Sequence, residues 1–131
     1  MKAQILFVAS FMVAVISADS SAAPPAGPPR VSEVIVLDVG ANMAKFADLS
    51  HRMDAITTKY QSTAKVHFWD TTFAGNNAGH LVVVVEYPSL LSMAQSQEKV
   101  MGSPEYAKWI ADVQASGIKV VSQSLLTEVH P

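Results

Sequence analysis

Two neighbouring segments of the chain carry side chains that could form a small reactive site. His67 and Trp69 are two residues apart in the segment KVHFWDTTF, so they share one face if that segment is a β-strand. Glu86 lies near the end of the next such segment, HLVVVVEY, on the same face as His80. An imidazole beside a carboxylate can act as a general base. An indole ring next to that pair would suit a flat organic ligand.

A structural interpretation of the same residues competes with the chemical one, and we prefer it. His67 and Glu86 could form a polar cross-strand pair at a sheet edge or at a subunit interface. Asp38 is a further candidate because it is a carboxylate within the apolar segment VSEVIVLDV. We therefore take four candidate ligand-binding residues, His67, Trp69, Glu86 and Asp38, and assign no catalytic residue.

Most other kinds of site lack the residues that they need. The sequence contains no cysteine, which excludes disulfides, zinc–thiolate sites and cysteine nucleophiles. Its histidines (His51, His67, His80 and His130) show no metal-binding spacing, and neither GxSxG nor a phosphate-binding loop occurs. Lysines and arginines are scattered singly against a formal charge of −2, which is unlike a nucleic-acid interface. We expect no metal, no cofactor and no nucleic-acid partner.

Hydrophobic periodicity predicts the elements that must position the candidate residues. Segments rich in β-branched residues indicate strands, and apolar residues three and four apart indicate helices. Strands are expected over Val31–Val39, Lys65–Phe73, His80–Tyr87 and Ile118–Val129. Helices are expected over 43–60, 90–101 and from Pro104 to a glycine stop at Gly117, with caps at Asn42, Ser89 and Ser103. The turn over 74–79 should join the two middle strands into an antiparallel hairpin.

The resulting order, β-α-β-β-α-β with a break at 102–104, is the ferredoxin-like α+β pattern. It predicts a four-stranded antiparallel sheet with the helices on one face. The segment Leu81–Val85 is apolar on both faces, and the first and last strands are similar. A large apolar sheet face left in water usually marks an interface. We therefore expect a homodimer in which two open sheet faces pack together as a barrel.

The beginning of the chain predicts export. Lys2 precedes an apolar run from Ile5 to Ile16, and small residues follow, as in a secretory signal. A bilayer span needs about twenty apolar residues, so we expect a cleaved signal peptide over 1–22 and no stable membrane anchor. Residues 23–30 are a proline-rich linker and 31–131 the folded domain. The expected location is periplasmic or secreted.

The folded part resembles the dimeric α+β barrel superfamily and, within it, small NIPSNAP-like and EthD-like proteins. The resemblance covers about Val31–Val129 and rests on four stretches: VLDVG before a helix, WDTTFAGNNAGHLVVVVEYPSLLSMAQ, the helix restart SPEY and the closing VVSQSLLTEV. It implies the dimeric barrel. Relatives in the superfamily include proteins without assigned activity, cofactor-free monooxygenases, haem-degrading and peroxidase-like enzymes and lactone isomerases. No site residue of these relatives is carried over to this chain.

Two functions follow from these observations. The first is binding of a small hydrophobic or aromatic molecule by an exported dimer without catalytic machinery. The second is a cofactor-independent monooxygenase-like or isomerase-like enzyme with a pocket near Trp69.

Export can be checked by sequencing the N-terminus of the protein released by a secreting host. Small residues precede both expected cleavage points, after Ala18 and after Ala22, so the mature chain should begin at Asp19 or Ala23. A chain that keeps Met1 and stays with the membrane fraction would contradict the prediction.

Overall fold

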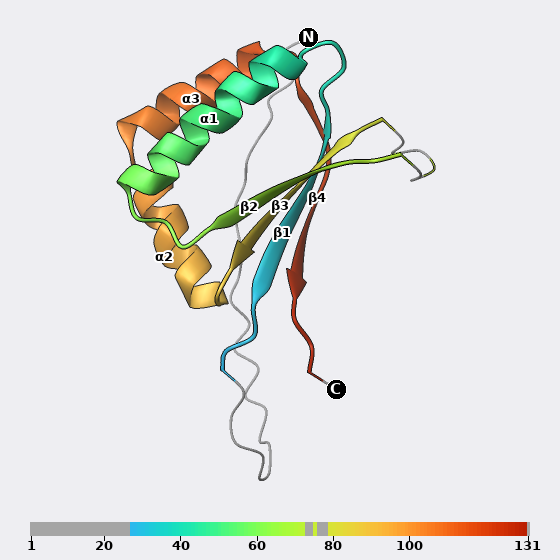
Figure 1. Cartoon of the computed structure of the whole chain (residues 1–131). Coiled ribbons are helices and arrows are strands. Elements are labelled where there is room, and N and C mark those ends of the chain that lie inside the picture. Colours follow the sequence, from blue (N-terminus) through green and yellow to red (C-terminus); the bar gives the residue numbers. More distant parts are fainter. Residues whose placement is uncertain (1–26, 73–74, 76–78, 131) are drawn as a thin grey trace.

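The computed structural model describes residues 27–72, 75 and 79–130, which form a sheet covered on one side by helices. Its elements are β1 (Val31–Asp38), α1 (Met43–Lys59), β2 (Lys65–Asp70), β3 (Leu81–Tyr87), α2 (Leu90–Met101), α3 (Pro104–Ala115) and β4 (Lys119–Thr127). Figure 1 shows α1 and α3 running side by side across the sheet, with α2 near its lower end. The expected signal peptide and residues 23–26 of the linker lie outside the described residues.

The sheet has the strand order β2-β3-β1-β4, and every neighbouring pair is antiparallel. The ferredoxin-like prediction is therefore confirmed, including the break between α2 and α3. The described helices are too short or too polar to cross a membrane. Pairing of two sheets into a barrel stays a prediction.

Local signals predicted most helix ends correctly. Ser89 and Ser103 each accept a hydrogen bond from the backbone amide three residues on, at 3.0 and 3.2 Å, and Pro104 opens α3. Gly117 follows α3 with φ of +80°, a conformation that glycine adopts readily. The expectation for Asn42 is wrong. Its side chain makes no capping bond, because its backbone (φ −97°, ψ 25°) is not in the extended conformation of a capping residue.

All four strands are shorter than predicted, β1 and β3 by one residue each and β2 and β4 by three residues each. β2 ends at Asp70 rather than Phe73, because the ladder to β3 ends where Asp70 faces Leu81. Thr71 is already part of the turn, and its amide and hydroxyl both donate to the His80 carbonyl, at 3.2 and 2.7 Å. β4 loses one residue at its start and two at its end relative to the expected range, and a bulge interrupts its pairing with β1.

The end of the linker is fastened to the end of the sheet. The Arg30 guanidinium donates to both carboxylate oxygens of Glu128, at 2.9 and 3.2 Å. The Glu128 amide donates to the Arg30 carbonyl at 2.9 Å. Arg30 therefore holds the first described residues beside the chain that follows β4, at the lower end of the molecule in Figure 1.

The hydrophobic core is divided into two clusters at opposite ends of β1. The first contains Val31, Tyr87 and Met93, and the second contains Val39, Leu49 and Ile118. Between these clusters the helices do not close onto the sheet. No residue of α3 is fully buried, and every residue of β2 is exposed.

Polar contacts join α1 to α3 within the helix layer. An ion pair, a short lysine–glutamate contact and two further hydrogen bonds connect them: Arg52 Nη2 to Asp112 Oδ2 at 2.7 Å, Lys59 to Glu105, Tyr60 Oη to Glu105 Oε2 at 2.8 Å, and Trp109 Nε1 to the Leu49 carbonyl at 2.8 Å. The two helices therefore form a connected layer.

Removal of the Glu105 charge should destabilise the protein in a pH-dependent way. Hydrogen bonds from Lys59 and Tyr60 lower the pKa of Glu105 from 4.5 to about 2. Because the folded-state pKa is the lower one, the stabilisation is complete above pH 4.5 and disappears as pH falls towards 2. Glu105→Gln should therefore lower the melting temperature at pH 7 by no more than a few degrees, because these side chains face water.

Thermal unfolding followed by circular dichroism at several pH values measures this effect. Glu98→Gln, on the exposed side of α2, is the control and should melt like the unmodified protein throughout. A Glu105→Gln deficit that is as large at pH 2.5 as at pH 7 would rule out the proposed ionic origin.

Candidate functional site

A cavity of about 820 Å³ lies between the sheet and the helix layer. Apolar side chains form most of its walls: Ile35, Leu37 and Val83 from the sheet, and Leu49, Met53 and Ile110 from the helices. Cavities of about 300–1,000 Å³ with mostly apolar walls commonly hold small organic molecules. Members of both core clusters form part of its walls: Tyr87 from the first, and Leu49 and Ile118 from the second.

Strand alternation places the sheet wall of the cavity. On β1 the odd-numbered residues face the helices, and on β3 Val83, Val85 and Tyr87 do the same. On β2 the residues that line the cavity are Val66 and Phe68. The helix walls come from the apolar stripes of α1 and α3, as the three- and four-residue spacing predicted.

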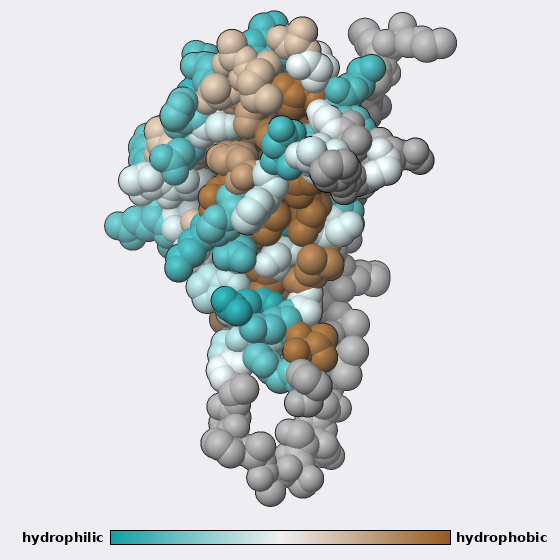
Figure 2. Space-filling view, turned by 45° about the vertical axis from the view of Figure 1, so that its right-hand side comes forward, coloured by the Kyte–Doolittle hydropathy of each residue, from teal (hydrophilic) through white to brown (hydrophobic). Residues whose placement is uncertain are grey.

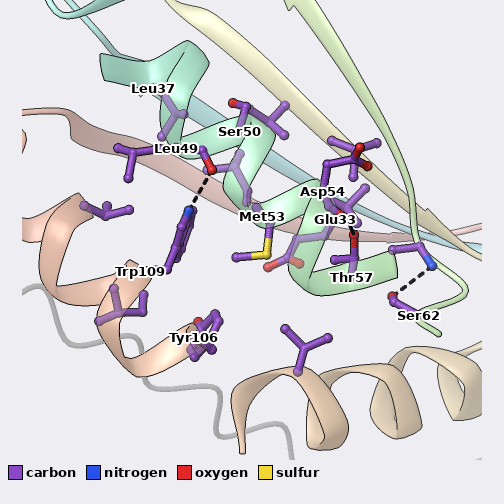
Figure 3. Close-up of a pocket in the computed structure, with 18 of the residues that line it drawn as sticks. Glu33, Leu37, Leu49, Ser50, Met53, Asp54, Thr57, Ser62, Tyr106 and Trp109 are labelled. Atoms are coloured by element: carbon purple, nitrogen blue, oxygen red, sulfur yellow. Dashed lines mark hydrogen bonds between the residues drawn. The ribbon is translucent and has the colours of Figure 1, made fainter. Parts of the chain in front are cut away.

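Aromatic rings line the cavity in two places. Phe46 of α1 and Phe68 of β2 meet edge to face, with ring centroids 5.5 Å apart and planes at 87°. Tyr106 and Trp109 of α3 stack with centroids 5.8 Å apart. The hydrogen bond from Trp109 to the Leu49 carbonyl, drawn in Figure 3, fixes the indole ring in this wall. These rings offer broad apolar surfaces to a bound molecule.

A small polar group interrupts the apolar lining. Glu33 extends from β1 into the space between the sheet and the helices (Figure 3), and its carboxylate accepts a hydrogen bond from the Gln123 side chain on β4. Burial is the main cause, and the negative charge of Glu33 a further cause, that raises the pKa of Tyr87 to about 12. The same two causes raise the pKa of Tyr106. Both phenols therefore stay protonated at neutral pH and can donate hydrogen bonds into the cavity.

None of the four predicted ligand-binding residues lines this cavity. Asp38, His67, Trp69 and Glu86 all lie on the opposite, open face of the sheet, as the strand registers show. The structure does bring two of them together, since His67 Nε2 is 3.4 Å from Glu86 Oε2. Whether these residues contact a ligand or a second subunit stays a prediction.

Trp69 lines neither this cavity nor the small pocket beside Glu33 and Met93, and the residue is 62% exposed. The physical reason is the alternation of β2. Its Val66 and Phe68 face is the more apolar one, so that face turns towards the helices and Trp69 turns away.

The open face of the sheet carries an apolar centre. Val34, Val36, Val82 and Val84 share this face on the two central strands. On β4, Ser122 and Ser124 lie opposite Val36 and Val34, and exposed Leu126 lies further along the strand, opposite Ser32. Figure 2, which brings the sheet side of the molecule forward, shows a band of hydrophobic residues between hydrophilic surfaces. The open face is defined here by the four valines and Leu126 together with Asp38, His67, Trp69 and Glu86.

Sequence reasoning missed Glu33, although a signal was present. Glu33 occupies the same strand face as Val31, Ile35 and Leu37, so it is a carboxylate on a face that otherwise packs against helices. The same alternation that picked out Asp38 would have found it. The described residues contain no group of three His, Cys, Asp or Glu side chains that could hold a metal ion.

Comparisons with known proteins reveal similarity in structure only. No protein-family model and no curated protein matches the sequence. A NIPSNAP family protein of unknown function from Agrobacterium tumefaciens superposes with a TM-score of 0.58 and 13% identity, over 78% of this chain and 89% of that one. SnoaB, a cofactor-independent oxygenase from Streptomyces nogalater, superposes with a TM-score of 0.55 and 12% sequence identity, over 79% of this chain and 96% of that one. An uncharacterized NIPSNAP-like domain protein from Burkholderia xenovorans superposes with a TM-score of 0.55 and 17% sequence identity, over 78% of this chain and 85% of that one.

The chain has the NIPSNAP-like fold. The fold resemblance expected from the sequence is thereby confirmed for NIPSNAP-like proteins, while the likeness to EthD-like proteins stays a prediction. At these identities the NIPSNAP-like fold fixes the architecture and leaves the chemistry to the residues of the cavity.

Proposed function

We propose that this protein binds a small hydrophobic or aromatic molecule in the cavity between its sheet and its helices. The cavity itself is the observation that carries the proposal, because about 820 Å³ of space with mostly apolar walls is unusual in a close-packed interior. Transfer of an apolar molecule from water into such a space is favourable. The two aromatic pairs, Phe46 with Phe68 and Tyr106 with Trp109, would contact a flat ligand.

We further propose that the protein acts as an exported homodimer. The leader sequence supports export, and the open face supports the dimer. Half-buried valines such as Val84 and exposed residues such as Leu126 and Trp69 would gain burial against a second copy. In that assembly His67 and Glu86 would lie at the interface, and the cavity of each subunit would remain on the other side of its sheet.

The likeness to SnoaB supports a second candidate function, a cofactor-independent oxygenase-like activity. Its reactive groups would lie in the cavity rather than near Trp69, with Glu33 as a base for a phenolic or enolic proton. Mass spectrometry of a bound aromatic compound after incubation in air distinguishes the two functions. Unchanged compound supports binding alone, and incorporation of oxygen supports turnover.

Filling the cavity should abolish ligand binding without unfolding the protein. Ile110 lines the cavity from α3, so Ile110→Trp would occupy space that a ligand needs. The affinity for the neutral dye Nile red, measured by fluorescence titration, should fall by about tenfold or more. A tenfold fall corresponds to the loss of about 1.4 kcal/mol of binding free energy.

Ala111→Trp is the matched control, because Ala111 is the next residue of α3 but is exposed and does not line the cavity. It should bind the dye as the unmodified protein does. Equal dye affinity in the two variants would place the dye outside the cavity and would refute the proposed site.

A charge in the centre of the open face should dissociate the dimer. Val84 lies there on β3, and a carboxylate buried between two sheets would be strongly unfavourable. Analytical ultracentrifugation should give a dimer for the unmodified protein and for Ala111→Asp, and a monomer for Val84→Asp. The Val84→Asp monomer should still bind Nile red, since the cavity lies on the other face. A monomeric unmodified protein at about 100 µM would contradict the dimer, because a stable interface of standard size binds more tightly.

A further inference from the structure

The charges around the cavity are of one sign. Among the described residues that line it, the carboxylates are Glu33 and Asp54, and none is a lysine or an arginine. His51, which also lines the cavity, is exposed on α1. Nearby cations are paired with acids elsewhere: Arg52 with Asp112, Lys59 with Glu105 and Arg30 with Glu128. The cavity therefore presents negative charge without a compensating cationic side chain.

Glu33 is the carboxylate that is set furthest into this space. It is half-buried on the sheet, whereas Asp54 is exposed on α1. In the described part of the chain Glu33 has a neutral partner, the Gln123 amide, and no cation within salt-bridge distance. A partly buried carboxylate without a cation is costly, and a positively charged group that reached it would be bound with corresponding strength.

The surroundings of Glu33 are suited to an organic cation. Tyr87 and Tyr106, whose pKa values the charge of Glu33 helps to raise, line the same cavity as Glu33. Tyr106 stacks with Trp109, which also lines this cavity, at a centroid distance of 5.8 Å. Aromatic faces attract ammonium groups through their electron-rich surfaces. Figure 3 shows Glu33, Met53, Tyr106 and Trp109 around the space between the sheet and the helices.

We propose that the cavity selects organic cations, an apolar or aromatic body that carries an ammonium group, with Glu33 as the charge partner of that group. The inference depends on the proposed binding function and adds the class of ligand. It also predicts exclusion: carboxylates such as fatty acids, which would fit the apolar walls equally well, are repelled by Glu33 and Asp54.

Three matched probes test the selectivity. 1-Naphthylmethylamine is a cation at pH 7, 1-naphthalenemethanol is neutral and 1-naphthoate is an anion, and the three share one aromatic body. Displacement of Nile red should give at least about tenfold tighter binding for the amine than for the alcohol, and at least about tenfold weaker binding for the naphthoate. If the amine binds no better than the alcohol, the inference fails while the proposed function stands. If none of the probes displaces the dye, the proposed function fails as well.

Two variants assign the selectivity to one residue. Glu33→Gln keeps the shape of the side chain and a hydrogen-bonding partner for Gln123. This variant should bind the amine only as tightly as it binds the alcohol. Asp54→Asn, at the exposed carboxylate, should retain most of the preference for the amine. The opposite result, loss of the preference in Asp54→Asn alone, would overturn the role of Glu33. Circular dichroism spectra and melting temperatures like those of the unmodified protein show that each variant keeps the fold.

Discussion

The two hydrophobic clusters at the ends of β1 hold the helix layer against the sheet, and the rest of the architecture depends on their separation. One contains Val31, Tyr87 and Met93, and the other Val39, Leu49 and Ile118. A cavity lies between the sheet and the helices, and members of both clusters, Tyr87 from one and Leu49 and Ile118 from the other, form part of its walls. The contacts between α1 and α3, including the hydrogen bond from Trp109 to Leu49, keep the helix layer together. The domain therefore combines marginal packing with a defined internal space.

The strands serve two surfaces at once, which explains their unusual composition. On β3 the residues Val83 and Val85 face the cavity, whereas Val82 and Val84 face outward. A sheet with water on one side would carry polar residues at the outward positions. Apolar side chains on both faces are consistent with one face that surrounds a ligand and another that meets a second subunit. The proposed ligand and the proposed second subunit would stay separate because the sheet itself lies between them.

The sequence predicted the elements and the antiparallel α+β architecture well, because these depend on short-range patterns. Serine caps, the glycine after α3 and the strand periodicity are properties of neighbouring residues. The site was harder to predict, because β3 is apolar on both faces and only the alternation of β2, with Val66 and Phe68 on one face, indicates which side of the hairpin meets the helices. His67 and Glu86 were correctly expected to come together, but on the open face. Glu33 was recognisable in principle as a charge among Val31, Ile35 and Leu37, whereas the cavity around it depends on the distance between layers, which periodicity does not report.

The ion pair between Arg30 and Glu128 brings both ends of the domain to one pole of the molecule. β1 begins there and the chain after β4 ends there, while the helices cover one flank of the sheet and the open face forms the other. A fluorescent label or a solid support attached beside Arg30 or Glu128 would consequently hold the domain at this pole, with the helix layer on one flank and the open face on the other.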